Sequence, residues 1–279
     1  MRLLATMLLI FIIAQVLGIY TGIAILLDMS HNPFVSGLVV TTDASDPLNA
    51  LFFMGYILAG AVFMILMIRY FGLSAILFEV MEFFLISSAS SIVFYAFIRL
   101  VAGYEVSTLA AIAMALAFSG IRRFSHGFKN AAAVLATAGV GVIFGVSLGL
   151  LPMIVFLIFL SFYDFMAVFM TKHMVEMAEF VVKKDLAFTV TARAPPPKPG
   201  MKEQRIDLGT GDMIAPIMME VAALQISPIA TLFVFVGAVV SLGLFLTLVW
   251  KKKMVLPALP PIVLGMLVSL MLGFLLGFY

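Results

Sequence analysis

The sequence contains no cysteine and only three histidines. Without cysteine there are no disulfides, thiol nucleophiles or thiolate metal sites. His31, His126 and His173 stand far apart, and no His-Glu-x-x-His pattern joins any of them to a metal-binding helix face. We therefore expect neither a metal site nor a cofactor.

Charged residues are also scarce, at 11% of a chain that is 64% hydrophobic, whereas soluble domains carry about 25%. The net charge of +2, with no basic stripe among aromatic residues, gives no reason to expect nucleic-acid binding. The apolar residues fall in runs of about 20, the length that a helix needs to cross a bilayer. The alternating segments of a membrane barrel are missing. The composition therefore predicts an all-α polytopic membrane protein.

The apolar runs predict about nine transmembrane helices, the first of them a retained span and not a cleaved leader. The expected spans are 3–27, 48–70, 82–101, 106–121, 131–150, 152–171, 211–226, 229–250 and 258–279.

The basic residues set the orientation of these spans. With the N-terminus inside and the C-terminus outside, every lysine and arginine except Arg99 falls in an inner segment. The first outer loop carries Asp28, Asp43 and Asp46 but no basic residue. This asymmetry follows the positive-inside rule and supports an odd number of spans.

One inner connection divides the chain into two helical groups. Residues 1–188 form six spans and an amphipathic extension that we expect to lie along the membrane surface. Residues 189–208 include a run of prolines and predict a flexible loop. Residues 209–279 form the last three spans.

Four acidic residues lie within the expected spans, where an ionised carboxylate is costly and a functional role is the default hypothesis. Asp164 lies deep in the sixth span, Asp212 opens the seventh, and Glu220 lies farther along it. Glu82 opens the third span, near the inner interface, where a solvated or capping role is favoured. Glu220 is interpreted as a hydrogen-bonded carboxyl in the bundle, with a role on a water path left open.

Asp164 and Asp212 are expected to meet. The sixth span runs inward and the seventh runs back, and each aspartate lies about 10–12 Å from the inner end of its helix. Two carboxyl groups at close range in a low dielectric share a proton, so one can act as general base for water while the other acts as general acid. Gly209 and Gly211 would let a peptide backbone approach Asp212, and Tyr163 could donate a hydrogen bond.

A third motif, Pro257-Ala258-Leu259, also enters from the inner side. Its neighbouring prolines disfavour helix and keep an irregular backbone near the depth of the aspartates. Such a backbone is tolerated within a membrane only where protein or water covers it.

These three motifs resemble those of the presenilin and signal peptide peptidase family. Tyr163-Asp164, Gly209-Thr210-Gly211-Asp212 and Pro257-Ala258-Leu259 occur in the family's order, on the sixth, seventh and ninth spans. The resemblance implies an intramembrane aspartyl protease of the GxGD type, with Asp164 and Asp212 as its catalytic pair. It further implies that Pro257-Ala258-Leu259 helps to recognise substrate.

Details of the motifs narrow the resemblance. Thr210 replaces the usual leucine of the family, and Pro260 follows the third motif as in presenilins. With an internal N-terminus, the chain is similar to a presenilin-like homologue of prokaryotic, archaeal type. This implies a multi-pass protein of a prokaryotic plasma membrane that cleaves transmembrane segments or signal peptides. The oligomeric state is left open.

One alternative class of protein remains. Carboxylate pairs within spans also serve as proton relays, so a proton-coupled transporter is the rival interpretation. The odd number of expected spans and the lack of a recognisable inverted repeat argue against it.

Overall fold

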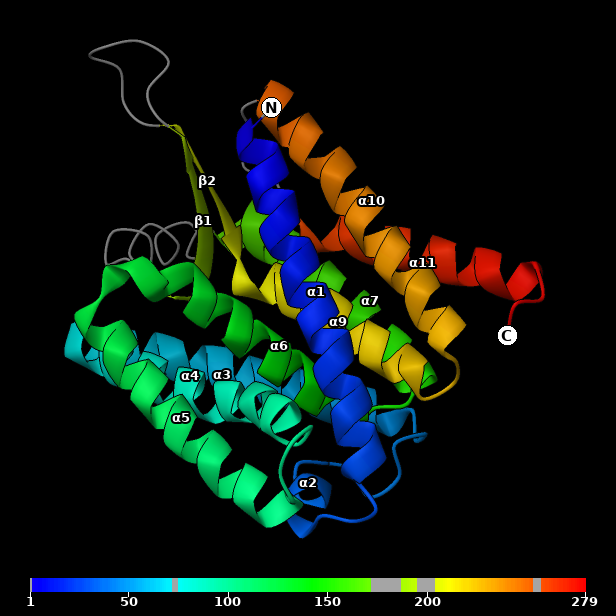
Figure 1. The fold of residues 1–279 in the computed structure, drawn as a ribbon. Coiled ribbons are helices and arrows are strands. Elements are labelled where there is room, and N and C mark those ends of the chain that lie inside the picture. Colours follow the sequence, from blue (N-terminus) through cyan, green and yellow to red (C-terminus); the bar gives the residue numbers. More distant parts are fainter. Residues whose placement is uncertain (1, 72–74, 172–186, 195–203, 253–256) are drawn as a thin grey trace.

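The fold, taken from a computed structural model, is described for residues 2–71, 75–171, 187–194, 204–252 and 257–279. The described part is almost entirely helical, with one two-stranded sheet (Figure 1). Its helices are α1 (Arg2–Asp28), the short α2 (Pro33–Ser36), α3 (Leu48–Phe71), α4 (Ala75–Ile98), α5 (Tyr104–Phe124), η1 (His126–Phe128), α6 (Lys129–Ser147), α7 (Leu150–Met166), η2 (Ala167–Thr171), α9 (Thr210–Leu224), α10 (Pro228–Lys252) and α11 (Leu259–Leu275).

Nine of these helices, within the described residues, correspond in order to the nine expected spans. Six are long and apolar enough to cross a membrane: α1, α4, α5, α6, α10, and α7 with its extension to Phe169. The Leu48–Phe63 stretch of α3 and the whole of α11 are apolar but shorter. The largest difference from the expected boundaries is in α4, which begins at Ala75, so Glu82 lies two turns inside the helix. The amphipathic segment expected after the sixth span lies outside the described residues.

Helix α9 is the centre of the bundle. It has 15 residues, of which Met213 and the run from Ala215 to Ala223 are buried. Gly141 and Gly145 of α6 allow the close contact: a Cβ at these positions would lie 2.6 Å from side-chain atoms of Ile217 and Val221, respectively. Small residues thus bring the α6 and α9 backbones together, as is common where membrane helices pack.

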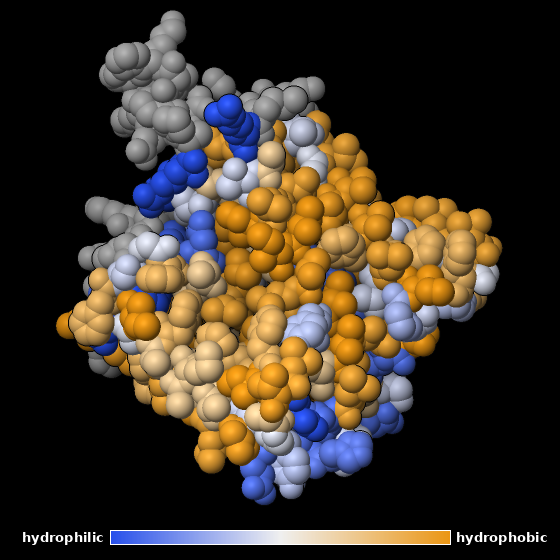
Figure 2. All heavy atoms as spheres, in the orientation of Figure 1, coloured by the Kyte–Doolittle hydropathy of each residue, from blue (hydrophilic) through white to orange (hydrophobic). Residues whose placement is uncertain are grey.

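The surface of the bundle is apolar across its middle and polar at two ends. Figure 2 shows hydrophobic residues over α1, α10 and α11, with hydrophilic residues gathered beside the N-terminus and around α2. Large apolar side chains such as Leu109 and Leu232 are more than half exposed. A surface of this kind suits lipid as its solvent.

The two-stranded sheet differs from the flexible loop expected at 189–208, in the part of that segment that the structure describes, 189–194 and 204–208. Strands β1 (Thr189–Ala194) and β2 (Gln204–Gly209) pair antiparallel, with Thr191 opposite Asp207. Val190, Ala192 and Leu208 are buried against the bundle, where β1 and β2 contact α1. Apolar residues alternate with polar ones along β1, in the period of two that is typical of strands. The prolines at 195–199 lie outside the described part.

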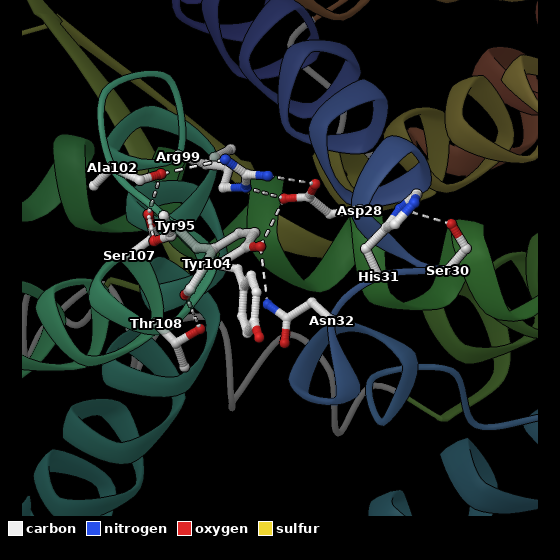
Figure 3. Close-up of polar contacts among 12 residues, drawn as sticks. Asp28, Ser30, His31, Asn32, Tyr95, Arg99, Ala102, Tyr104, Ser107 and Thr108 are labelled. Atoms are coloured by element: carbon white, nitrogen blue, oxygen red, sulfur yellow. Dashed lines mark hydrogen bonds and ion pairs between the residues drawn. The ribbon is translucent and has the colours of Figure 1, made fainter.

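The opposite end of the bundle is closed by a polar cluster that we call the clamp: Asp28, Asn32, Tyr95 and Arg99 (Figure 3). Asp28 Oδ2 accepts hydrogen bonds from Arg99 Nε at 2.6 Å and from the Tyr95 hydroxyl at 2.7 Å. Asn32 Nδ2 donates to the Tyr95 oxygen at 2.9 Å. The clamp joins the C-terminal ends of α1 and α4, and it gives Arg99, the one basic residue expected outside, an acidic partner.

Candidate active site

Asp164 lies near the end of α7, where the helix changes its hydrogen-bond pattern. The Ala167 N–H donates to the carbonyls of Tyr163 and Asp164, and residues 167–171 continue as the π-helix η2. Short π-helical segments within helices are frequent at functional sites because they turn neighbouring side chains to new directions. Tyr163 is half-buried beside Asp164, and its role as a hydrogen-bond donor stays a prediction.

Asp212 lies in the first turn of α9, directly after β2. Gly209 caps the helix with an extended backbone, and a Cβ there would lie 3.3 Å from Asp212 Oδ2. A Cβ at Gly211 would meet nothing within 4 Å, so this position is open. Farther along, the buried Pro216 has no N–H, and the Asp212 carbonyl therefore loses its usual helical partner. Both the side chain and the backbone of Asp212 are left with acceptor capacity.

Asp164 lies on α7 and Asp212 on α9, two helices that contact each other and that both contact α11. Asp164 Oδ2 is buried and has no hydrogen-bond partner within the described residues. An unpaired carboxyl oxygen in such a place is costly unless it holds a proton or water.

The Pro257-Ala258-Leu259 segment reaches the same place. All three residues are buried, and α11 begins at Leu259 with prolines in its first turn. The Leu259 backbone N–H donates a hydrogen bond to the Asp164 carboxyl group. The segment has no titratable side chain, yet its backbone contacts one member of the pair. Sequence reasoning did not anticipate this hydrogen bond.

The hairpin is tied to both sides of this site. Thr210, at the start of α9, donates from its backbone N–H and from its hydroxyl to the Phe188 carbonyl, each at 3.1 Å. Glu82 Oε1 accepts from the Ala187 N–H at 2.7 Å and pairs with Arg122 at 3.1 Å. Glu82 is 7% exposed, so the interpretation of a solvated side chain is wrong. Its carboxylate instead anchors the chain just before β1.

Asn130 and Lys129, at the start of α6, hold the middle of β1. Asn130 Nδ2 donates to the Thr191 carbonyl at 2.8 Å, and the Thr191 N–H donates to Asn130 Oδ1 at 3.0 Å. Lys129 Nζ donates to the Thr191 hydroxyl, which donates to Asp207 on β2 at 2.6 Å. Nothing in the sequence pairs Asn130 with Thr191, because 61 residues separate them.

Glu220 stands apart from these contacts. It is fully buried in α9, and neither carboxyl oxygen has a hydrogen-bond partner within the described residues. The expected hydrogen-bonded carboxyl is therefore not formed by its side chain. No group of three or more metal-binding side chains occurs in the described part.

Comparison with known proteins agrees with this architecture. The family described as signal-peptide peptidase, presenilin aspartyl protease matches residues 8–278. Two solved structures of a presenilin family intramembrane aspartate protease, in space groups C222 and P2, are similar over nearly the whole chain. The first has 22% identity and a TM-score of 0.64, covering 98% of both chains. The second has 25% identity and a TM-score of 0.67, covering 98% of this chain and 97% of that one. No curated protein matches.

Because the family match spans almost all of its length, the chain belongs to the signal peptide peptidase and presenilin family of intramembrane aspartyl proteases. It is a multi-pass membrane protein and an aspartic protease. The transporter interpretation finds no support in the comparisons.

Proposed function

We propose that Asp164 and Asp212 are the catalytic pair of this protease, in a site of the GxGD type. The observation that carries the proposal is the convergence of α7 with Asp164, α9 with Asp212, and α11 with the preceding Pro257-Ala258-Leu259 segment, since these three helices all contact one another. With one proton between them, the ionised carboxylate removes a proton from water as it attacks the scissile carbonyl. The protonated carboxyl donates to the carbonyl oxygen, giving a tetrahedral intermediate.

The substrate we propose is an extended stretch of a transmembrane segment. A helical peptide hides its carbonyls in internal hydrogen bonds, so it must unwind before water can reach the scissile bond. The unwound stretch then needs new backbone partners, and an exposed strand edge provides them. The outer edge of β2 leads directly through Gly209 and Gly211 to Asp212.

The hairpin has two edges, and the strand register shows which backbone groups point outward on each edge. The bond from the Thr210 N–H to the Phe188 carbonyl makes this pair a hydrogen-bonded one, and such pairs alternate along antiparallel strands. Thr191 and Asp207 therefore form a pair that turns its backbone groups outward, on opposite edges. Thr191 is bonded to Asn130, whereas the outward groups of Asp207 and Gly209 bond to no described residue. The β2 edge is the one we assign to substrate.

We further propose nine spans with the hairpin on the cytoplasmic side and the C-terminus outside. The basic residues Arg122, Lys129, Arg193 and Arg205 all lie at the hairpin end of the bundle, in agreement with the positive-inside rule. A prokaryotic plasma membrane and substrates such as signal peptides fit this arrangement. A homo-oligomer is left open by it.

Cleavage of a synthetic transmembrane peptide by the purified protein tests the proposed function. The protein in lipid vesicles should release fragments that mass spectrometry maps within the apolar stretch. The Asp164→Asn variant, matched in size and fold, should release none. Chelators should leave the rate unchanged. Failure of the wild-type protein to cleave any of several transmembrane peptides would contradict the proposal, and so would cleavage by the variant.

A further inference from the structure

Asn130 makes an unusual pair of hydrogen bonds for a side chain. Its amide gives one donor and one acceptor to the same residue, Thr191, at 2.8 and 3.0 Å. A neighbouring strand would satisfy the same N–H and carbonyl with its own backbone, in the same donor and acceptor pattern. The Asn130 amide therefore takes the place of a third strand at the middle of β1.

Exposed strand edges accept other strands readily, and proteins block them by covering or capping the backbone groups. Here the capped edge belongs to β1. Lys129 adds to the cap, since it reaches the Thr191 hydroxyl from the same turn of α6. Asn130 and Thr191 are only partly accessible or buried, so water offers little competition for these bonds.

The choice of edge matters for chemistry. A peptide added to β2 runs beside Gly209 and continues to Asp212, because β2 leads into α9 without a break. A peptide added to β1 would be separated from that path by the full width of the hairpin. Neighbouring strands are about 4.8 Å apart, and three such spacings separate a peptide on β1 from a peptide on β2, so the displacement is about 14 Å.

We propose that Asn130 is a positioning residue that closes the β1 edge, so that substrate pairs only with β2 and is presented to the aspartates in one register. The proposal rests on the proposed function, in which an extended substrate adds to the hairpin. Asn130 touches neither substrate nor the reacting atoms. It acts through Thr191 and the hairpin.

Cysteine crosslinking can show which strand edge the peptide binds, because the chain has no cysteine of its own. Arg193 and Arg205 are both exposed and are paired across the hairpin, one on each strand. A disulfide requires Cα atoms within about 7 Å, which neighbouring strands satisfy and strands two positions apart do not. A peptide with one cysteine near its cleaved bond should crosslink to Arg205→Cys and not to Arg193→Cys.

The Asn130→Ala change should then add a crosslink to Arg193→Cys and spread the cleavage sites over several bonds. We expect KM to rise by about three- to tenfold, with kcat within about twofold of wild type, since productive binding is diluted. Asn130→Asp keeps the acceptor for the Thr191 N–H but loses the donor, and it should give a weaker version of the same result. If Asn130→Ala does not fold, the Asn130→Asp variant still tests the proposal.

Gln225→Ala is the matched control. Gln225 Nε2 donates to the carbonyls of Gly145 and Leu148, at the opposite end of the same α6 helix. Its removal costs similar side-chain to backbone hydrogen bonds but should leave the crosslinks and the cleavage map unchanged.

The outcomes separate the two proposals. If the wild-type protein cleaves peptides but both Asn130 variants keep the wild-type cleavage map and crosslink only through Arg205→Cys, the role of Asn130 is wrong. Crosslinking of the otherwise unchanged protein through Arg193→Cys would also overturn it. If the wild-type protein cleaves nothing, the proposed function itself fails.

Discussion

The two ends of the bundle both carry buried polar clusters, but the side chains of these clusters bond to different kinds of partner. At the clamp end, side chains bond to one another and join two helices: Asp28 to Arg99 and Tyr95. At the hairpin end, side chains bond to backbone groups: Glu82 to the Ala187 N–H and Asn130 to Thr191. The clamp fixes helices that are already complete. The hairpin cluster fixes β1 on one side of a two-stranded sheet, and the β2 edge on the other side is the one we assign to a partner.

The largest expected difference between the ends comes from replacing aspartate by asparagine. Asp164→Asn or Asp212→Asn should lower turnover by about 10⁴-fold or more, because an amide cannot exchange a proton between the two roles. Asp28→Asn makes the same chemical change in the clamp and should leave turnover per folded molecule near that of wild type. Peptide cleavage rates, normalised to folded protein, provide the measurement. Substantial turnover by a folded Asp164→Asn protein would contradict the assignment of the pair.

The dependence of rate on pH should be confined to the hairpin end. Catalysis by a pair that shares one proton requires that proton to be present and the second to be absent. Activity should therefore fall on both sides of an optimum, by roughly tenfold per pH unit far from it. Rate profiles of wild type and Asp28→Asn should coincide in shape. A flat profile over the accessible range would argue against the pair.

Substitutions at Gly209 and Gly211, both at the hairpin end, should impair catalysis in different ways. At Gly211 a Cβ meets nothing, so Gly211→Val should fold normally and raise KM by about tenfold by obstructing the substrate. At Gly209 a Cβ lies 3.3 Å from Asp212 Oδ2, so Gly209→Ala should act mainly on kcat. Steady-state kinetics separate the two.

Leu259 gives a related contrast, since its backbone N–H and its side chain serve different partners. Leu259→Ala keeps the N–H that bonds to Asp164, so it should shift cleavage positions while an active-site-directed inhibitor still titrates the pair as in wild type. Unchanged kinetics and an unchanged cleavage map would show that the segment does not position substrate.

The smallest expected effect lies in the clamp. Tyr95→Phe removes a buried hydroxyl that joins Asp28 and Asn32. The loss should cost about 1–3 kcal/mol of stability, or a Tm lower by about 2–4 °C for each kcal/mol. Thermal unfolding in detergent measures it, with cleavage maps as the companion readout. A changed cleavage map in Tyr95→Phe would show that the two ends are coupled.

Much of the helical arrangement follows from the sequence, because long apolar runs indicate membrane spans and an acid such as Asp164 within a span indicates a functional site. The position of Asp212 at a helix start also follows, since Gly209 and Gly211 interrupt the helical pattern before it. These features are local. A window of about 20 residues contains all the information they need.

Three features of the structure could not be predicted from a local window of the sequence. The hairpin depends on pairing six-residue strands across a proline-rich segment, and its alternation of Val190, Thr191 and Ala192 is too short to outweigh those prolines. The burial of Glu82 depends on Arg122, which comes from another helix. The Leu259 hydrogen bond to Asp164 depends on how α11 packs against α7. Each is a long-range contact, which sequence spacing does not encode.

Helix α9 has a consequence for how the protein is made. Its 15 residues span about 22 Å, less than the roughly 30 Å of a hydrocarbon core. It also carries the helix-breaking Pro216, and Glu220, whose carboxyl group has no hydrogen-bond partner among the described residues. Such a segment is a poor candidate for insertion on its own during synthesis. We therefore expect α9 to remain at the translocation channel until α10 follows, and to enter the membrane only alongside helices that already hold a place for it. The helix that carries Asp212 should thus enter the membrane late because of its length and because of Pro216 and Glu220 within it.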